Sequence, residues 1–297
     1  MSLVVVGSIG LDSISTPSGS VVDAVGGSAV YASVSASYFT SVNLIGVVGI
    51  DYPDSAIDLL RRHGINLEGL EIAEGKTFRW KGEYHDLNKA ETLSTELNVF
   101  ADFIPKLPQN CISCHSLLLA NIHPSLQLRV LEETRVYHHV ACDTMNFWIN
   151  GCPDDLAQVI GRVHIVFMNE DEVKAFTGKH NIFSAAQSVL DMGPTLIVVK
   201  RGEYGSVALT RDYILFAPAY PVREVKDPTG AGDTFAGAFM AWLEGHAELS
   251  REVVSQALRY ASVMAALNVS EFSVMGILDL QRESIENHKE RLCRMTI

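Results

Sequence analysis

The sequence has few cysteines and few positive charges for its length. Only five of its 297 residues are cysteine, and an odd number of thiols scattered over so long a chain favours reduced cysteines over a disulfide framework. The net charge of −12 disfavours nucleic acid or an anionic membrane as a partner, because such surfaces select clustered Lys and Arg. A small anionic ligand, held by a few local cations and backbone amides, stays open.

Long apolar runs and a basic leader are also missing. Residues 1–7 carry neither a basic region nor a long apolar stretch, which predicts no signal peptide and no membrane span. We therefore expect a cytoplasmic protein. Cys111 and Cys114 precede His115 in the spacing of covalent haem attachment, but that chemistry requires export, and the apolar run that follows indicates a buried strand.

Several familiar catalytic motifs are absent. The chain has no G-x-x-x-x-G-K-[ST] loop, no G-x-G-x-x-G near its first strand, and neither H-E-x-x-H nor G-x-S-x-G. These absences argue against a Walker-type NTPase, a Rossmann dinucleotide site, a zinc protease and an α/β-hydrolase. The 47% hydrophobic content is that of a globular protein.

What the chain does contain is an alternation of short apolar runs with helical patterns. This rhythm is typical of a parallel sheet in an α/β fold, and no linker or repeat divides it, so we expect one domain over residues 1–297. The expected strands lie near 3–6, 43–48, 117–120, 140–143, 165–168 and 195–200, and the expected helices near 29–38, 53–63, 125–133, 153–161, 250–267 and 279–294.

Residues 74–100 interrupt the rhythm. Two runs, 77–84 and 92–100, are strand-like and surround a polar turn, which predicts an antiparallel, partly exposed excursion. Arg79 lies in the first run beside two lysines. It is a candidate to meet an anionic substrate, although a solvated face of an edge strand explains the same pattern.

Polar residues follow several of the expected strands. In open α/β sheets, ligands bind outside the carboxyl ends of the strands, so these side chains are candidates for a binding crevice. Each of them is also explained as a turn residue or a helix cap. The residues are Asp12, Asn121, Asp143, Asn146, Asn169 and Glu172.

The most informative stretch is Asp227-Pro-Thr-Gly-Ala-Gly-Asp233. Its proline and glycines oppose a helix, whereas the residues after it have helical spacing. A glycine turn that leads into a helix N-terminus suits a phosphate, because free N–H groups and the positive end of the helix dipole meet there. Asp233 at its edge indicates phosphoryl transfer: the carboxylate accepts a hydroxyl proton while the Gly230–Gly232 amides face the transferred group.

Residues 227–237 resemble the second signature of the ribokinase-like (PfkB) carbohydrate kinase family, commonly D-[TP]-x-G-A-G-D-x-F. Three further stretches resemble elements of that family and occur in the same order, between residue 3 and about residue 273. They are Asp12 with Gly26-Gly27 for the sugar, Asn169-Glu-Asp-Glu172 for the N-x-x-E motif, and Lys200-x-Gly202-x-x-Gly205 for the nucleotide loop.

The resemblance implies a three-layer α/β/α fold with a mostly parallel central sheet and a small β-sheet lid, formed mainly by residues 74–100 and partly by 11–25. It implies an ATP-dependent kinase that phosphorylates a hydroxyl, in our interpretation a primary alcohol, of a small sugar or sugar derivative, with MgATP as the donor. An exposed lid edge favours a homodimer formed by edge pairing.

The resemblance also assigns roles by position. Asp233 is implied as the catalytic base, and Gly230, Ala231 and Gly232 as the anion hole. Asp227 and Thr229 match a K⁺ position, although the stretch 268–273 lacks the usual glycine. The ATP-binding residues are expected to be Asn169, Glu172 (through a water on Mg²⁺), Lys200, Gly202, Gly205 and Ser262, and the implied acceptor residues are Asp12, Gly26 and Gly27. To these acceptor residues we add Tyr31, Arg79, Asn121 and Asn146 as candidates, from their own positions in the sequence.

The acceptor residues depart from the family pattern. Tyr31 stands where the family often has Asn, which argues against ribose. The segment from Asp143 to Asn146 resembles the D-x-N region of ketodeoxygluconate kinases, but Phe147 and Trp148 replace the Arg that often follows. Two alternatives stay open: a nucleoside kinase whose aromatic side chains stack on the base, and a non-catalytic sugar or nucleotide sensor, against which the retained Asp233 and Glu172 argue.

Overall fold

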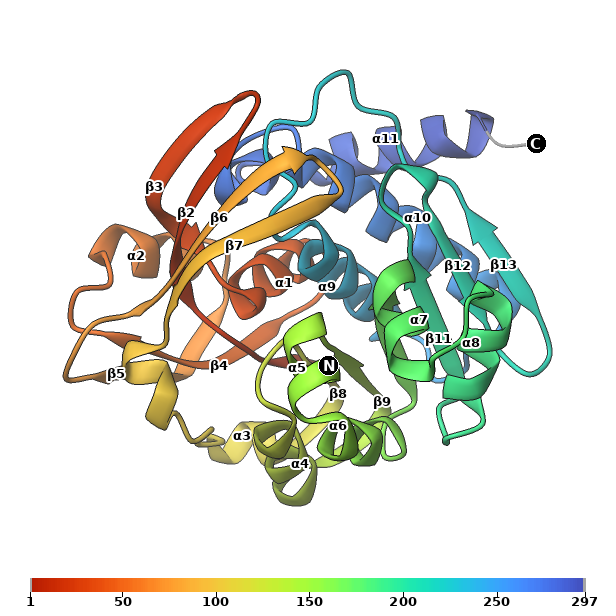
Figure 1. Cartoon of the computed structure of the whole chain (residues 1–297), viewed down its shortest axis with the longest axis horizontal. Helices are drawn as coiled ribbons and strands as arrows, with labels where there is room; N and C mark the ends of the chain where they lie inside the picture. The colour runs from red at the N-terminus through yellow and green to blue at the C-terminus, as the bar shows by residue number, and fades with distance from the viewer. Residues whose placement is uncertain (1, 296–297) are drawn as a thin grey trace.

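The computed structural model (Figure 1) describes residues 2–295, and its largest element is a nine-stranded sheet of order β13-β12-β11-β10-β9-β8-β1-β4-β5. From β11 to β5, each strand is parallel to its neighbours, whereas β12 and β13 form an antiparallel hairpin at one edge. The bounds are β1 (Leu3–Val6), β4 (Val42–Gly49), β5 (Asn66–Ala73), β8 (Ser113–Leu119), β9 (Arg135–Asp143), β10 (Ile165–Asn169), β11 (Leu196–Lys200), β12 (Ser206–Leu209) and β13 (Ile214–Ala217).

Helices cover both faces of this sheet, because its strands are apolar on both sides. In β1, Leu3 and Val5 join one hydrophobic cluster, while Val4 and Val6 join another. The first cluster is covered by α1 (Ser28–Ser37), α2 (Asp54–Arg62), α9 (Ala231–Leu243), α10 (Arg251–Asn268) and α11 (Arg282–Met295). The second is covered by α3 (Gln109–Ile112), α4 (Pro124–Glu133), α5 (Asn146–Gly151), α6 (Pro153–Ile160), α7 (Glu170–Thr177) and α8 (Ile182–Leu190).

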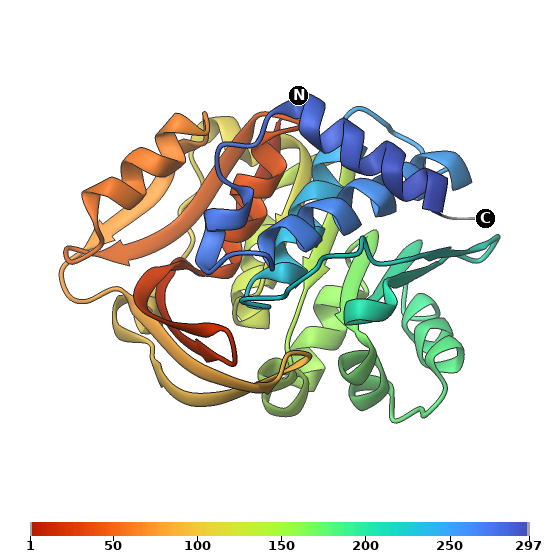
Figure 2. The same cartoon turned by 90° about the horizontal axis from the view of Figure 1, so that it is seen from above.

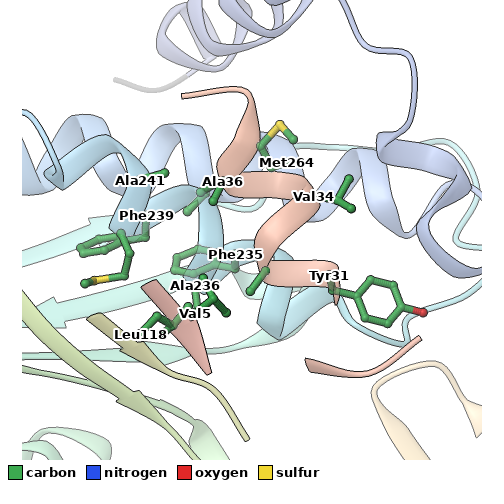
Figure 3. Close-up of a cluster of buried hydrophobic side chains, with 14 of the residues drawn as sticks. Val5, Tyr31, Val34, Ala36, Leu118, Phe235, Ala236, Phe239, Ala241 and Met264 are labelled. Carbon is green, nitrogen blue, oxygen red and sulfur yellow. The ribbon is translucent and has the colours of Figure 1, made fainter. Parts of the chain in front are cut away.

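Helices α1 and α9 pack unusually closely, and we call them the α1–α9 pair. A Cβ on Gly237 of α9 would overlap the backbone carbonyl of Ala32 in α1, so only glycine fits there. The Ser35 hydroxyl also donates to the Thr234 carbonyl at 2.8 Å. Figure 3 shows the apolar side chains between this pair and the sheet, with Phe235 and Phe239 of α9 facing Val5 and Leu118.

A second sheet, of order β3-β2-β6-β7, stands apart from the first, and we call it the lid (Figure 2). It consists of β2 (Gly10–Thr16), β3 (Gly19–Gly26), β6 (Phe78–Asp86) and β7 (Lys89–Glu96). Strand β6 runs parallel to β2, and β3 and β7 pair antiparallel on the two outer sides. All eight residues of β7 are exposed, so one long edge of the lid is open.

The expected three-layer α/β/α fold with a mostly parallel sheet and a small second sheet is confirmed. Two expected boundaries are wrong. The strand expected over 92–100 ends at Glu96, because Asn98 has a positive φ of 49° and the 3-10 helix η1 (Asn98–Asp102) follows. The last helix begins at Arg282 rather than near Asp279, whose φ of 54° is incompatible with a helix.

Three further observations complete the fold. Strand β5 was not among the expected strands, and two more 3-10 helices occur, η2 (Gly202–Tyr204) and η3 (Ser273–Ile277). Cys111, Cys114, Cys142 and Cys152 are free thiols. Within residues 2–295, no helix is both long and apolar enough to cross a membrane.

Candidate active site

The site lies at the carboxyl ends of the parallel strands, where α/β sheets bind their ligands. Three neighbouring strands each end on a candidate residue from the sequence analysis. Strand β9 ends on Asp143, β10 on Asn169 and β11 on Lys200. Because Asn169 pairs with Lys200 in the sheet register, these side chains leave the sheet at the same level. Helix α9 begins beside them.

The start of α9 has the geometry that the glycine motif predicts. Gly230 is the N-cap residue and adopts the left-handed conformation, with φ 73°. A Cβ on Gly230 would overlap the ring of Tyr31, which packs directly against this peptide. Helix α9 then starts at Ala231, whose N–H donates to the Pro228 carbonyl at 3.3 Å. The first-turn N–H groups of Gly232 and Asp233 point out of the helix end, where an anion can accept them.

The two aspartates of the motif have different surroundings. Asp227 is 0% exposed, and its carboxylate accepts the N–H groups of Thr229 and Ser273, both at 2.9 Å. Asp233 stands in the first turn of α9 and is half-buried. Asp227 therefore fixes the loop, whereas the position of Asp233 leaves it available for chemistry.

Asp233 is surrounded by other charged groups. Burial raises the pKa of Asp233 to about 7, the Asp143 carboxylate adds to the rise, and the Lys200 ammonium opposes it. A carboxyl with a pKa near neutrality is a better proton acceptor at pH 7 than an ordinary aspartate. The arrangement can therefore take a proton from a hydroxyl.

Lys200 supplies the positive charge of the site. Its Nζ lies 2.6 Å from Asp143 Oδ2, and it would stand 3.0 Å from a Cβ on Gly232. Burial lowers the pKa of Lys200, but the carboxylates of Asp143 and Glu172 outweigh that effect and leave it raised. The lysine stays charged beside the anion hole, where it can neutralise a phosphate.

Asn169 and Glu172 form a capping box at the start of α7. The Glu172 N–H donates to Asn169 Oδ1 at 2.8 Å, and Glu172 Oε2 accepts the Asn169 N–H at 2.6 Å. Burial raises the pKa of Glu172 to about 7. The N-x-x-E pattern thus has a structural role here, and its carboxylate also lies near Lys200 and Asp233. Among the described residues, no three His, Cys, Asp or Glu side chains are arranged to hold a metal ion by themselves.

Asp12, Gly26 and Gly27 come together, and we call the region around them the acceptor side, after the role that the sequence predicts for these residues. A Cβ on Gly26 would overlap the Asp12 carboxylate, and Gly27 has a φ of 98° that favours glycine. Burial raises the pKa of Asp12 to about 7, Asp227 and Asp233 add to the rise, and the Gly27 N–H opposes it. Asp12 and Asp233 are therefore neighbours, although 221 positions separate them in the sequence.

Tyr31 packs against Gly230 and lies near both Asp12 and Asp233. The side chain is 1% exposed, and its hydroxyl has no hydrogen-bond partner among the described residues. Figure 3 shows the ring directed away from the apolar cluster that the other labelled side chains of α1 and α9 form. Burial raises the pKa of Tyr31, with Asp12 and Asp227 adding to the effect, so the hydroxyl stays protonated.

Asn121 joins an aromatic group to the acceptor side. Its backbone carbonyl accepts the Ser28 hydroxyl, next to Gly27, at 3.2 Å, and its side-chain Oδ1 accepts the Trp148 indole N–H at 2.8 Å. Trp148 stacks edge-on against Phe147, which is 65% exposed. Asn146 is exposed at the start of α5, beside these rings.

Three predicted residues are placed away from these groups. Trp80 pairs with Asp12 in the register of β6 and β2, so the Arg79 side chain lies on the other face of β6, away from Asp12. There the Arg79 guanidinium forms an ion pair with Asp51 at 2.8 Å. The Ser262 hydroxyl donates to the Pro218 carbonyl and accepts the Tyr220 N–H, both at 2.9 Å, which ties α10 to the segment after β13. Gly205, with φ 84°, packs against the backbone of 217–219.

The structure also shows contacts that the sequence did not predict, for the candidate Asp143 and for Tyr84, which the sequence did not single out. Asp143 is the ion-pair partner of Lys200, and its place at a strand end was the only sequence signal. Tyr84 of the lid reaches the glycine motif, where its Oη lies 3.1 Å from Thr229 Oγ1. The alternation of aromatic and charged residues in 77–84 predicts that Tyr84 lies on the aromatic face of a strand, but it does not identify Thr229 as its partner.

Comparisons with known proteins agree with this geometry. A family model described as pfkB family carbohydrate kinase matches residues 2–279. The cytidine kinase of Thermococcus kodakarensis is 30% identical over 249 residues, which are 81% of this chain and 88% of that protein.

Solved structures show the same fold. The nucleoside kinase of Methanocaldococcus jannaschii, described as an archaeal member of the ribokinase family, superposes with a TM-score of 0.79 at 18% identity and covers 98% of each chain. An Escherichia coli structure described as ribokinase II, in complex with ATP and Mg²⁺, gives a TM-score of 0.76 at 19% identity and covers 97% of this chain and 99% of its own.

Proposed function

We propose that this chain, which belongs to the pfkB family of carbohydrate kinases, transfers the γ-phosphate of MgATP to the primary alcohol of a nucleoside. Membership of the family makes the chain a phosphotransferase that acts on a sugar or a nucleoside. The choice of a nucleoside between these two is our proposal. It replaces the simple sugar that we expected first and adopts the alternative that the aromatic residues had suggested.

The observation that carries this choice is the aromatic group on the acceptor side. Phe147 is 65% exposed, although burial would remove its large apolar surface from water. Asn121 holds the neighbouring Trp148 and contacts Ser28, next to Gly27. An exposed aromatic ring that is linked through Trp148 and Asn121 to the start of α1 fits a base attached to a ribose, because bases stack on aromatic side chains. A simple sugar has no planar group for these rings. The similarity to a cytidine kinase supports the same choice.

The chemistry follows from the positions of the charged groups. Asp233 accepts the proton of the acceptor hydroxyl, and Asp12 binds other hydroxyls of the same molecule. The N–H groups of Gly230, Ala231 and Gly232 face the charge of the phosphoryl group, with Lys200 beside them. Bound Mg²⁺ supplies further neutralisation of the phosphate oxygens. The protein therefore contributes position and charge, which is what a loose phosphoryl-transfer transition state requires.

The residues present fit a nucleotide triphosphate. Gly232 in the first turn of α9 has no side chain to cover the N–H groups of the helix N-terminus, and Lys200 stands next to it, so phosphate oxygens can approach. We propose that Asn169 and Glu172 act on Mg²⁺ through water and that Gly202 and Gly205 shape the nucleotide loop. Ser262 would act on ATP through the segment 218–220 that it holds.

A monovalent cation fits the loop around Asp227. This carboxylate is 0% exposed and forms no ion pair with any lysine, arginine or histidine of the described chain. Asn268 donates to the Thr229 carbonyl at 2.9 Å, and its own buried Oδ1 has no partner there. A buried anion beside an unpaired acceptor is the environment that a cation stabilises. We propose K⁺, held next to Asp227 and Thr229.

The open edge of the lid supports a homodimer. Strand β7 exposes all eight residues, and a free edge of this length pairs readily with another strand. We propose that two copies pair along β7, that residues 1–297 act as one domain with residues 11–25 and 74–100 as its lid, and that the enzyme works in the cytoplasm without a nucleic-acid or membrane partner.

A substrate panel tests the proposed acceptor. Release of ADP is measured with cytidine, uridine, adenosine, guanosine, ribose, deoxyribose and fructose, each with MgATP. We expect at least one nucleoside to exceed every free sugar in kcat/KM by about tenfold, because stacking of a base contributes about 1–3 kcal/mol. A free sugar that exceeds all nucleosides would overturn the choice.

A variant of Phe147 ties the result to the aromatic group. Phe147→Leu is expected to lower kcat/KM for the preferred nucleoside about tenfold and to leave slow turnover of a free sugar unchanged. Tyr137→Leu is the matched control, since Tyr137 is 64% exposed at the amino end of β9, six residues before Asp143. An equal loss for sugar and nucleoside would contradict a stacking role.

A further inference from the structure

Tyr84 is a buried residue next to the most exposed strand of the lid. It lies in β6 and is 8% exposed, while every residue of the adjacent β7 is exposed. In the register of β6 with β2, Trp80 is opposite Asp12, and Gly82 is opposite Ile14. Because side chains alternate along a strand, Tyr84 lies on the same face of the lid as Trp80 and Asp12. That is the face turned toward the acceptor side.

The hydroxyl of Tyr84 is bonded to the loop that carries the anion hole. Its Oη lies 3.1 Å from Thr229 Oγ1, across 145 positions of sequence. Burial raises the pKa of Tyr84 to about 12; the Thr229 hydroxyl opposes the rise, and Asp227 and Asp12 add to it. The phenol therefore stays protonated at every pH at which the enzyme works.

Thr229 is held at three points. Its N–H donates to Asp227 Oδ1 at 2.9 Å, its carbonyl accepts from Asn268 at 2.9 Å, and its hydroxyl meets Tyr84. The next residue is Gly230, whose left-handed conformation starts the anion hole. Two of the three contacts come from the main domain, and the third is the only one of them supplied by the lid. A shift of Thr229 therefore moves the peptide that faces the phosphoryl group.

The same hairpin also reaches the nucleotide loop. Asn88 lies in the turn between β6 and β7, and its Oδ1 would be 2.5 Å from a Cβ on Gly202. Figure 1 shows this hairpin directed from the lid toward the side of the molecule that carries α9. The lid thus meets the glycine motif through Tyr84 and the nucleotide loop through Asn88, on both sides of the place proposed for the phosphates.

We infer that Tyr84 is a positioning residue that couples closure of the lid to the geometry of the anion hole, by holding Thr229 next to Gly230. The inference rests on the proposed roles of Asp233 and the anion hole, but it does not depend on which acceptor is correct. A group that acts this way affects kcat more than KM, because the anion hole faces charge that develops in the transition state.

A double-mutant cycle tests the inference, with the best acceptor from the panel and saturating MgATP. Tyr84→Phe and Thr229→Val each remove one hydroxyl of the pair. We expect each to lower kcat about five- to tenfold, with KM values for ATP and acceptor within about twofold of the wild type. The double variant is expected to lose no more than either single variant, because both remove the same hydrogen bond.

Three controls separate positioning from other roles. Thr229→Ser keeps a hydroxyl and is expected to retain kcat within about twofold. Tyr137→Phe makes the same chemical change on an exposed tyrosine at the amino end of β9 and is expected to have no effect. Melting temperatures identify any variant that fails to fold, and in that case the other partner of the pair still tests the contact.

The outcomes are distinct. Losses that multiply to about 25- to 100-fold in the double variant would overturn the inference, since independent effects add in free energy. A rise in the acceptor KM alone would overturn it as well, because Tyr84 would then bind the acceptor directly. Failure of every nucleoside in the panel contradicts only the proposed acceptor, and the cycle is then measured with the sugar that is phosphorylated.

Discussion

The α1–α9 pair and the lid supply groups to the same site but are built in opposite ways. Nine of the ten residues of α1 are buried, whereas all eight residues of β7 are exposed. The two helices touch through backbone atoms at Gly237 and Ala32, while the lid meets the main domain through side-chain hydroxyls such as that of Tyr84. Close-packed elements hold a fixed geometry, and exposed elements open at low cost.

This difference corresponds to a division of labour. The pair carries Asp233 and the anion hole, which need a constant position relative to one another. The lid carries Asp12, which we propose meets an acceptor that must enter and leave, and Tyr84, which contacts Thr229 beside the glycine turn. We therefore expect changes in the pair to cost both activity and stability, and changes in the lid to cost activity with little change in stability.

The largest expected effect is that of Asp233→Asn. The amide cannot accept the proton of the acceptor hydroxyl, so kcat should fall about 10³-fold. The melting temperature should not fall, because the substitution removes a buried carboxyl whose ionised form is unfavourable. Steady-state rates and thermal melts measure the two quantities.

The control is Asp227→Asn, six residues earlier in the same motif. Asp227 holds the loop through two backbone N–H groups, so its amide variant should lower the melting temperature. If Asp227→Asn keeps the melting temperature and Asp233→Asn lowers it, the assignment of structural and chemical roles is reversed.

The next effect is a pH dependence of the wild type. Since Asp233 must be ionised and its pKa is about 7, kcat/KM should fall about tenfold per unit below pH 7 and level off above it. Rates from pH 5 to 9 test this. A profile that stays flat down to pH 5 would exclude Asp233 as a base with this pKa.

Stability should move in the opposite direction. The folded-state pKa of Asp233 is above its ordinary value of 3.8, so its protonation favours the folded state. That contribution is complete below about pH 4 and disappears as the pH rises through 7. The melting temperature of Asp233→Asn minus that of the wild type should therefore increase from pH 5 to pH 8. Comparing the two proteins cancels the contributions of the carboxyls that do not interact with Asp233.

A smaller effect is expected from Gly237→Ala in α9. The added methyl would overlap the Ala32 carbonyl, so the two helices must separate, at a cost of about 1–3 kcal/mol. Chemical denaturation measures the loss. Gly151→Ala in α5 is the matched control, since nothing lies within 4 Å of its added Cβ, and it should be neutral or slightly stabilising. Equal losses at both positions would contradict the special closeness of α1 and α9.

The smallest effect on stability is expected in the lid. Leu93 of β7 is 49% exposed, so Leu93→Lys should change the free energy of unfolding by less than about 0.5 kcal/mol. The same charge opposes edge pairing, so sedimentation should show a smaller dimer fraction. A large loss of stability without any change in assembly would mean that β7 packs against its own chain.

The sequence predicted best what depends on local conformation. The glycine turn at 227–233 and the start of α9 follow from the backbone preferences of Pro228, Gly230 and Gly232, which act within a few residues. The order of strands and helices follows from periodicity. The fold and the conformation of the glycine turn at the start of α9 could therefore be read directly from the chain.

Contacts across the site could not be predicted in this way. The Lys200–Asp143 ion pair depends on the register of β9, β10 and β11. That register could not be predicted from any single residue of the sequence. The placement of Arg79 depends on which face of β6 turns inward, which the pairing with β2 decides. Ser262 is a similar case, because its hydroxyl is used by the backbone of 218–220.

The contact between Gly237 and Ala32 also bears on regioselectivity. Helix α1 follows directly from Gly27 on the acceptor side, and α9 carries Asp233 in its first turn. The closest approach of the two helices thus fixes how far the proton acceptor stands from the groups that hold the rest of the acceptor. We therefore expect the separation of the two helix axes to influence which hydroxyl of the proposed nucleoside is phosphorylated, and a larger residue at position 237 to affect that choice as well as the rate.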